Sequence, residues 1–243
     1  MKKIMSLALL LCGVVFLLGG KRVPEKKEEN NLKCGFNYEQ GMIIAENSNS
    51  CFRYERKADE PKNLMIVAHP DDEVIFGGAH LLNEKYTVVC ITCGKVDYRV
   101  DEFTEVMGKT EDDYIMLGYD DRVNITGPIS DWSYQYDDIY ASLKDIIESG
   151  KWDKIVTHNP DGEYGHLHHK LTSEIVTDIT GGNNLYYFGH WYKNGDSYNR
   201  LDDETYDRKV NDLLGVYYRS QGVALNYNSG MFGYENWIEA NNW

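Results

Sequence analysis

Three residues that could bind a metal and move protons lie together in the segment His-Pro-Asp-Asp-Glu, directly after the apolar run at residues 64–68. His69 offers an imidazole nitrogen, and Asp71 and Asp72 offer adjacent carboxylates. Because neighbouring side chains on an extended segment point in different directions, one aspartate can bind a metal while the other faces a substrate. The alternative is structural: Asp71 or Asp72 caps a following helix, and Glu73 suits the helix dipole.

A second polar cluster, at residues 158–169, follows a later apolar run and contains more histidines. His166 and His169 are three positions apart, so they share a face if a helix begins near Gly165. His168 is two positions from His166 and is expected to point elsewhere. If both clusters meet at one sheet edge, His69, Asp72 and one of these histidines come together. Two histidines, a carboxylate and an open position are typical of a catalytic zinc site.

The elements that must position these residues alternate between strand and helix. Short apolar runs predict strands at residues 64–68, 86–92, 114–117, 154–157 and 185–188. Helices are expected up to about residue 83 and at 102–107, 139–148, 170–179 and 204–214, whereas the chain from residue 217 gives no clear pattern. This alternation indicates an α/β fold with a mostly parallel sheet, which binds ligands at the carboxyl ends of its strands.

The composition of the 243 residues limits the class of partner. A formal net charge of −14 argues against nucleic acid or anionic lipid headgroups as an electrostatic partner. Cys34 and Cys51 would form a disulfide in an oxidising compartment or stay as two thiols. Cys90 and Cys93 lie in or beside a predicted strand and are interpreted as packing residues.

The N-terminus has the features of a targeting segment. Lys2 and Lys3 precede an almost wholly apolar stretch at residues 4–20, which is at the lower limit for a membrane-spanning helix. We expect residues 1–20 to be an uncleaved anchor that makes the protein membrane-associated; the alternative is a cleaved signal and secretion. Residues 21–60 are expected to be a linker and N-terminal extension, and residues 61–243 the folded domain.

Three motifs together resemble the PIG-L/LmbE-like zinc-dependent deacetylases. They are AHPDDE at residues 68–73, the pair Gly77-Gly78, and GEYGHxxH at residues 162–169. The resemblance covers roughly residues 63–185. It implies a Rossmann-like three-layer sandwich and hydrolysis of the N-acetyl group of an N-acetylglucosaminyl substrate.

The resemblance also implies metal and catalytic roles. His69, Asp72 and His169 match the ligands of Zn²⁺, although Fe²⁺ could occupy the same set. Asp71 matches the general base that takes a proton from the metal-bound water. His166 matches the residue that, as imidazolium, stabilises the oxyanion and protonates the leaving amine.

Substrate contacts follow from weaker matches. Tyr164 matches a mobile tyrosine near the acyl group, and Arg99 and Asp121 match sugar or headgroup contacts. One position departs from the family: His168 replaces the Asp or Asn that usually precedes the last histidine. If that acid orients the neighbouring catalytic histidine, a histidine cannot do so equally well.

The leading hypothesis is therefore a membrane-anchored zinc deacetylase, with a glycolipid such as N-acetylglucosaminyl-phosphatidylinositol as one candidate substrate. A deacetylase of soluble glycosides or thiol-linked sugars is the second. A non-catalytic sugar-binding protein that keeps the pocket is the third, and His168 is the feature that favours it. A nucleotide-binding Rossmann domain has little support, because no G-x-G-x-x-G follows the first strand.

Overall fold

A seven-stranded sheet forms the centre of the fold in this computed structural model, which describes residues 42–44, 61–124, 126–192 and 198–243. The strands are β1 (Met42–Ile44), β2 (Asn63–Val67), β3 (Tyr86–Thr92), β4 (Asp113–Tyr119), β5 (Lys154–Thr157), β6 (Leu185–Tyr187) and β7 (Ile238–Glu239). Their order is β1-β4-β3-β2-β5-β6-β7. Every neighbouring pair is parallel except β6 and β7. The predicted α/β fold with a mostly parallel sheet is confirmed.

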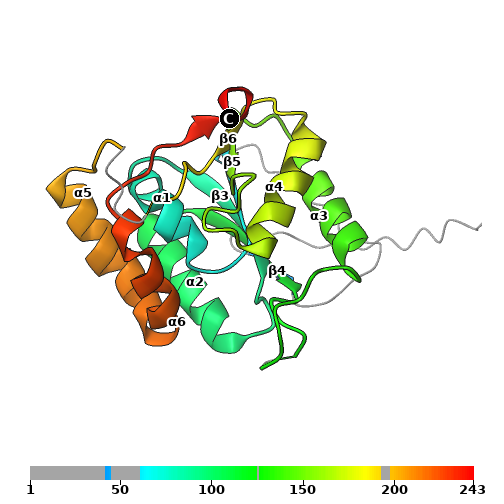
Figure 1. The fold of residues 1–243 in the computed structure, drawn as a ribbon, viewed down its shortest axis with the longest axis horizontal. Coiled ribbons are helices and arrows are strands. Elements are labelled where there is room, and N and C mark those ends of the chain that lie inside the picture. The colour runs from blue at the N-terminus through cyan, green and yellow to red at the C-terminus, as the bar shows by residue number, and fades with distance from the viewer. Residues whose placement is uncertain (1–41, 45–60, 125, 193–197) are drawn as a thin grey trace, which may run out of the picture. The chain divides into compact units, whose positions relative to one another are not determined.

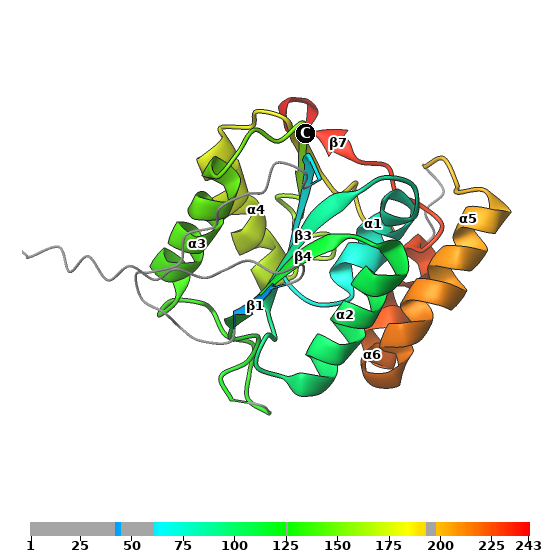
Figure 2. The ribbon, with the colours of Figure 1, turned by 180° about the vertical axis from the view of Figure 1, so that it is seen from behind.

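Helices cover both faces of the sheet (Figures 1 and 2). The helices are α1 (Asp72–Asn83), α2 (Asp97–Thr110), α3 (Tyr136–Glu148), α4 (Leu167–Thr180), α5 (Asp203–Asp207), the π-helix η1 (Arg208–Leu214), α6 (Gly215–Asn228), and the short 3₁₀ turns η2 (Ser229–Met231) and η3 (Ala240–Asn242). Figure 1 shows α3 and α4 on one side of the sheet and α1, α2, α5 and α6 on the other. The fold thus has three layers, helix, sheet and helix.

The alternation of side chains along β2 explains why residues 64–67 of this strand are all apolar. Met65 and Val67 belong to the core beneath α1, α2 and α6, whereas Leu64 and Ile66 belong to the core beneath α3 and α4. All four are fully buried. A strand that is buried on both faces has no position at which a polar side chain would reach water, so a continuous apolar run results.

The strand order also places the ligand-binding edge. The chain leaves β2 toward β3 and β4 on one side, whereas β5 and β6 lie on the other. The connections therefore reverse direction between β2 and β5, and such a reversal opens a crevice at the carboxyl ends of the two strands. Both polar clusters of the sequence follow these two strands.

Several elements differ from the expectations. Helix α2 is longer than predicted because its buried face includes the polar residues Arg99 and Glu102, which hide the apolar periodicity. Helix α6 gave no pattern because it continues from a π-helix and is kinked at Gln221 (φ −113°), and each irregularity shifts the helical period. Strand β1 pairs with β4 from within the stretch expected to be linker and extension.

The predicted membrane anchor and both N-terminal cysteines, Cys34 and Cys51, lie outside the described residues. Among the helices that the structure does describe, none combines the length and the apolar character needed to cross a membrane.

Candidate active site

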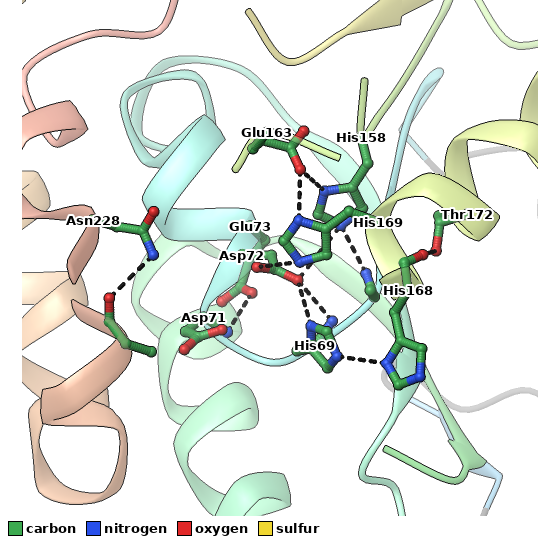
Figure 3. Close-up of polar contacts among 12 residues, drawn as sticks. His69, Asp71, Asp72, Glu73, His158, Glu163, His168, His169, Thr172 and Asn228 are labelled. Atoms are coloured by element: carbon green, nitrogen blue, oxygen red, sulfur yellow. Dashed lines mark hydrogen bonds and ion pairs between the residues drawn. The ribbon is translucent and has the colours of Figure 1, made fainter. Parts of the chain in front are cut away.

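The turns after β2 and β5 bring His69, Asp72 and His169 into one cluster (Figure 3). The Nδ1 atom of His69 lies 3.1 Å from Oδ2 of Asp72, and Nε2 of His169 lies 3.3 Å from Oδ1 of the same carboxylate. Asp72 is the first residue of α1, and His169 lies in the first turn of α4. Residues almost a hundred positions apart therefore converge on a single carboxylate.

Neither aspartate acts as the helix cap that the structural alternative required. Asp71 occupies the N-cap position of α1, yet its side chain makes no cap hydrogen bond within the described part of the chain. Asp72 instead accepts a hydrogen bond from the His69 backbone N–H at 2.9 Å. Asp71 has φ 118°, a backbone conformation that non-glycine residues rarely adopt and that often marks functional sites.

The carboxylate of Glu163 fixes the orientation of two histidine rings. Its Oε2 atom lies 2.5 Å from Nδ1 of His169 and 3.0 Å from Nδ1 of His158. Because a carboxylate accepts, both rings carry hydrogen on Nδ1. The Nε2 atom of His158 then accepts the backbone N–H of Ala68 at 3.0 Å. The Nε2 atom of His169 is buried and has no hydrogen-bond partner among the described residues.

This pattern identifies which residues could hold a metal. The described residues contain three overlapping groups that could do so, namely His69/His166/His169, Asp72/His158/His169 and His69/Asp121/His168. His158 is a poor ligand because its Nε2 lone pair is already used by Ala68. His169 fits, since a ligating histidine usually has its other nitrogen held by a carboxylate. The predicted ligand set of His69, Asp72 and His169 combines members of two of these groups, and Asp72 joins them because its oxygens lie 3.1 Å from Nδ1 of His69 and 3.3 Å from Nε2 of His169. Without a metal the Asp72 carboxylate accepts a hydrogen from Nδ1 of His69, and a divalent cation would take the place of that hydrogen.

The surroundings of Asp71 and Asp72 shift the pKa values of the two carboxyl groups in opposite directions. Burial raises the pKa of Asp71 to about 7, although the Arg99 guanidinium 3.9 Å away favours the ionised form. Burial also acts on Asp72, but the neighbouring histidines outweigh it and hold that pKa well below its usual range. Asp71 is thus suited to exchange protons near neutral pH, whereas Asp72 stays a carboxylate.

His166 and Tyr164 border the cluster on its open side. His166 immediately precedes α4, and its ring lies 4.5 Å from that of His169 between centroids. Burial, with the charge of His69, lowers the pKa of His166 to about 3, so the ring is neutral at pH 7 in the free protein. The Tyr164 ring lies 5.9 Å from His166.

The expectation that His168 points elsewhere is wrong. Its Nδ1 atom lies 2.9 Å from Nε2 of His69. The expectation assumed helical spacing from His166, but α4 begins at Leu167, and His166 is extended with ψ 131°. His69 also has a second ring nitrogen on the side away from Asp72, and that nitrogen meets His168.

The two residues expected to contact the sugar occupy different settings. Asp121 has a side chain that is 33% exposed, and its Oδ1 atom lies 3.5 Å from Nε2 of His69. Arg99 is buried, donates to the Pro70 carbonyl and pairs with Glu102 at 3.8 Å. Both line the cleft described below, and a substrate contact by either remains a prediction.

Part of the chain matches the model of a known protein family. Residues 64–180 match the family model described as PIG-L, GlcNAc-PI de-N-acetylase. Residues 64–180 form a PIG-L family domain. The matched range contains both polar clusters and the strands that carry them.

Relatives of this PIG-L domain include proteins of known and unknown activity. An uncharacterised protein of Acanthamoeba polyphaga mimivirus is 34% identical over 149 residues, which are 54% of this chain and 62% of that protein. A 1D-myo-inositol 2-acetamido-2-deoxy-alpha-D-glucopyranoside deacetylase of Streptomyces griseus is 30% identical over 141 residues, 44% of each chain. The match therefore spans less than two thirds of the length of either relative.

Solved structures show a similar fold. A deacetylase of the teicoplanin biosynthesis pathway superposes with a TM-score of 0.52 and 17% identity, over 69% of this chain and 88% of that one. A zinc-inhibited form of the teicoplanin deacetylase gives a TM-score of 0.52 at 15% identity, over 70% and 88%. At this level of identity the likeness concerns the fold of the PIG-L domain.

A cleft of about 920 Å³ opens onto the cluster of the PIG-L domain. Asp71, His166 and Tyr164 line it beside the predicted metal ligands His69 and Asp72, and Asn228 of α6 also lines it. This volume lies within the range of roughly 300–1,000 Å³ that small-molecule sites occupy. Reactive groups are therefore accessible to a ligand the size of a sugar derivative.

The sequence did not indicate that His158, Glu73 and Tyr217 take part in the site of the PIG-L domain, where they hold other site residues in place. His158 follows β5 as His69 follows β2, and that shared position was the available signal. Glu73 accepts the Asp71 backbone N–H at 3.0 Å and also the Tyr217 hydroxyl. No sequence signal pointed to Tyr217, because it lies 144 positions from its partner.

Proposed function

We propose that this protein is a metal-dependent hydrolase that removes the N-acetyl group from an N-acetylglucosaminyl substrate, with Zn²⁺ as its metal. The main observation behind the proposal is that Nε2 of His169 is buried, has no hydrogen-bond partner among the described residues and lies 3.3 Å from the Asp72 carboxylate. Asp71 lies beside this pair and lines an accessible cleft. Such an arrangement suits a cation and a proton acceptor next to a substrate. Membership of the PIG-L family supports the amide-hydrolase chemistry.

His69, Asp72 and His169 are the residues that would hold the metal. When bound, a divalent metal lowers the pKa of a coordinated water and polarises a carbonyl oxygen. Glu163 keeps hydrogen on Nδ1 of His169, so that Nε2 is always the nitrogen presented to the cation. Asp72 stays ionised and supplies the negative charge of the set.

Asp71 is the proposed general base. Its pKa of about 7 lets a large share of the molecules hold it as a carboxylate at neutral pH while it still accepts a proton readily. The two hydrogen bonds around it, from Arg99 to the Pro70 carbonyl and from the Asp71 N–H to Glu73, fix its backbone. The carboxylate therefore needs little rearrangement to take a proton from the attacking water.

His166 and Tyr164 are proposed to act on the acetyl group and the leaving amine. His166 is neutral in the free protein, so its first contribution is an N–H bond to the developing oxyanion rather than the full positive charge expected from the sequence. The amine must then gain a proton to leave, and the proton taken up by Asp71 balances that demand. Tyr164 lies beside His166 and would contact the acyl group.

Two features bear on the aglycone of the substrate and on the location of the protein. The apolar residues 4–20 favour a membrane anchor and hence a lipid-linked substrate, for which N-acetylglucosaminyl-phosphatidylinositol is the candidate. The deacetylase named for a myo-inositol glycoside among the relatives favours a soluble glycoside instead. A non-catalytic sugar-binding protein is the remaining alternative.

Release of free amine from N-acetylglucosamine compounds tests the proposal. We expect the full chain with added Zn²⁺ to release amine, a strong chelator to abolish the release, and Asp71→Asn to lose turnover by roughly a hundredfold or more while still binding metal. Comparing lipid-linked, inositol-linked and free sugars then ranks the substrates. Metal binding at one per chain without release from any of them would favour the sugar-binding alternative.

A further inference from the structure

His168 lies between the predicted metal ligand His69 and a backbone carbonyl (Figure 3 shows it beside His69). Its Nε2 atom is 2.6 Å from the Ser130 carbonyl oxygen, and its Nδ1 atom is 2.9 Å from Nε2 of His69. The residue is fully buried, and its ring stacks on Trp132 at 4.1 Å between centroids with an interplanar angle of 7°. The ring is therefore held firmly in one orientation.

The direction of each hydrogen bond follows from the partners. A carbonyl oxygen accepts, so Nε2 of His168 carries the hydrogen. A neutral imidazole has a single N–H, and the contact with the Ser130 carbonyl oxygen places it on Nε2. Its Nδ1 atom is consequently an acceptor. The hydrogen between the two rings must then belong to Nε2 of His69.

We propose that His168 is a positioning residue that accepts the Nε2–H of His69 and thereby presents Nδ1 of His69 to the metal. The inference rests on the proposed metal-binding function. In this proposal His168 orients the ligand His69, just as Glu163 orients the ligand His169. One ligand is thus held by a neutral histidine and the other by a carboxylate. His168 acts on the ligand His69 rather than on His166.

The loop before α3 completes this arrangement. Trp132 is fully buried and donates its Nε1–H to the Asp120 carbonyl at 2.8 Å. Its backbone N–H donates to the Ser130 hydroxyl at 3.3 Å. These bonds hold the Trp132 ring and the Ser130 carbonyl together, so the position of the His168 ring is fixed. The flat face of Trp132 packs better against a planar imidazole than against the shorter side chain of an Asp or Asn at position 168.

The alternative is that the facing nitrogens of His69 and His168 bind a second cation instead of sharing a hydrogen. His69 Nε2, His168 Nδ1 and Asp121 Oδ1 form one of the groups that could hold a metal. The 2.9 Å separation between the two nitrogens favours a shared hydrogen, because the nitrogens would otherwise repel each other. A second cation there would also leave His69 with metal on both nitrogens.

Two conservative variants separate a role toward His69 from a role in anchoring the loop. In His168→Asn the Oδ1 atom takes the place of Nδ1, so the acceptor for His69 is retained. In His168→Gln the amide reaches the place of Nε2, so the donor for Ser130 is retained and the acceptor is lost. His168→Phe keeps the stacking on Trp132 and removes both.

The measurement is Zn²⁺ affinity by competition with a chromophoric chelator, on full chains whose melting temperatures confirm folding. We expect His168→Gln and His168→Phe to weaken binding about 10- to 100-fold and His168→Asn to stay within a few-fold of the native protein. Equal affinity in the Gln and native proteins, or stronger binding by Gln than by Asn, would overturn the proposal. So would two zinc ions per native chain, of which one is lost in His168→Phe.

Nitrogen-15 NMR of the histidine rings gives a readout that needs no metal. A hydrogen on Nε2 of His69 that exchanges slowly in the native protein and rapidly in His168→Gln would support the proposal. A hydrogen on Nδ1 of His168 would overturn it. If the native protein binds no metal while the first NMR result holds, the proposed function fails but the hydrogen bond between the two rings stands.

Discussion

Replacing Glu163 with Gln tests whether the carboxylate behind the site sets the metal-binding nitrogen of His169. The side chain of Glu163 is fully buried and accepts three N–H donors on two oxygens. One oxygen serves the rings of His158 and His169, and the other accepts the Asn159 backbone N–H at 3.0 Å. Gln keeps the shape but offers an acceptor at one of the two oxygen positions.

The size of the effect follows from counting the donors left unpaired. If the Gln oxygen faces the two rings, its NH₂ group meets the Asn159 N–H, and one buried donor loses its partner. In the opposite orientation the two rings lose theirs. Each such loss costs about 1–3 kcal/mol, so stability should fall by at least that amount. Metal affinity should fall about 10- to 100-fold, since His169 is no longer held in one tautomer.

Thermal unfolding and zinc competition measure both effects, with Asp161→Asn as the matched control. Asp161 lies in the same loop and is exposed, so this variant removes the same charge without disturbing a buried bond. We expect the control to behave like the native protein. A Glu163→Gln protein that matches the control in both melting temperature and zinc affinity would refute the assignment of Glu163 to His169.

Two further predictions concern groups outside the metal-binding set. Tyr217→Phe removes the hydroxyl that donates a hydrogen bond to Glu73, so we expect the free energy of unfolding to fall by about 1–3 kcal/mol and kcat to decrease. The control is Tyr218→Phe at an exposed neighbouring position, which should change neither quantity. Burial raises the pKa of Asp112 to about 6, so its ionisation costs stability as pH rises from about 4 through 6. Because Asn can still accept the Tyr86 N–H, Asp112→Asn should be more stable than the native protein at pH 7.5, by up to about 3 kcal/mol, and the difference should shrink toward pH 4.5. Melting curves across that range check the sign, and a difference that grows at low pH contradicts it.

The sequence predicted the structure well where a run of apolar residues has the length of a strand and is followed directly by motif residues. The runs that became β2, β3 and β5 are mostly apolar because both faces of these strands are covered, and β3 and β5 match their predicted bounds. The motif residues His69, Asp72 and His169 meet because the strands that precede them are neighbours. A local pattern is sufficient for such elements.

Contacts that join distant segments through polar atoms could not be predicted in this way. The π-helix η1 interrupts the helical period before α6, so Tyr217 gave no amphipathic signal. His168 was interpreted from its spacing to His166 alone. Its actual partners, the Ser130 carbonyl and the Trp132 ring, lie 36–38 positions earlier in a loop without regular structure. Only the fold shows which side of each ring is accessible.

The functional unit of this protein extends beyond the region that the family model matches. The φ of 118° at Asp71 is a conformation that costs of order 1–3 kcal/mol unless its surroundings enforce it. Arg99 enforces it from α2 through the Pro70 carbonyl, and Glu73 through the Asp71 N–H. Glu73 is in turn bonded by the Tyr217 hydroxyl, which belongs to α6 and lies after residue 180. Residues 64–180 contain every group proposed to touch the metal, yet the geometry of the proposed base depends on the C-terminal helices.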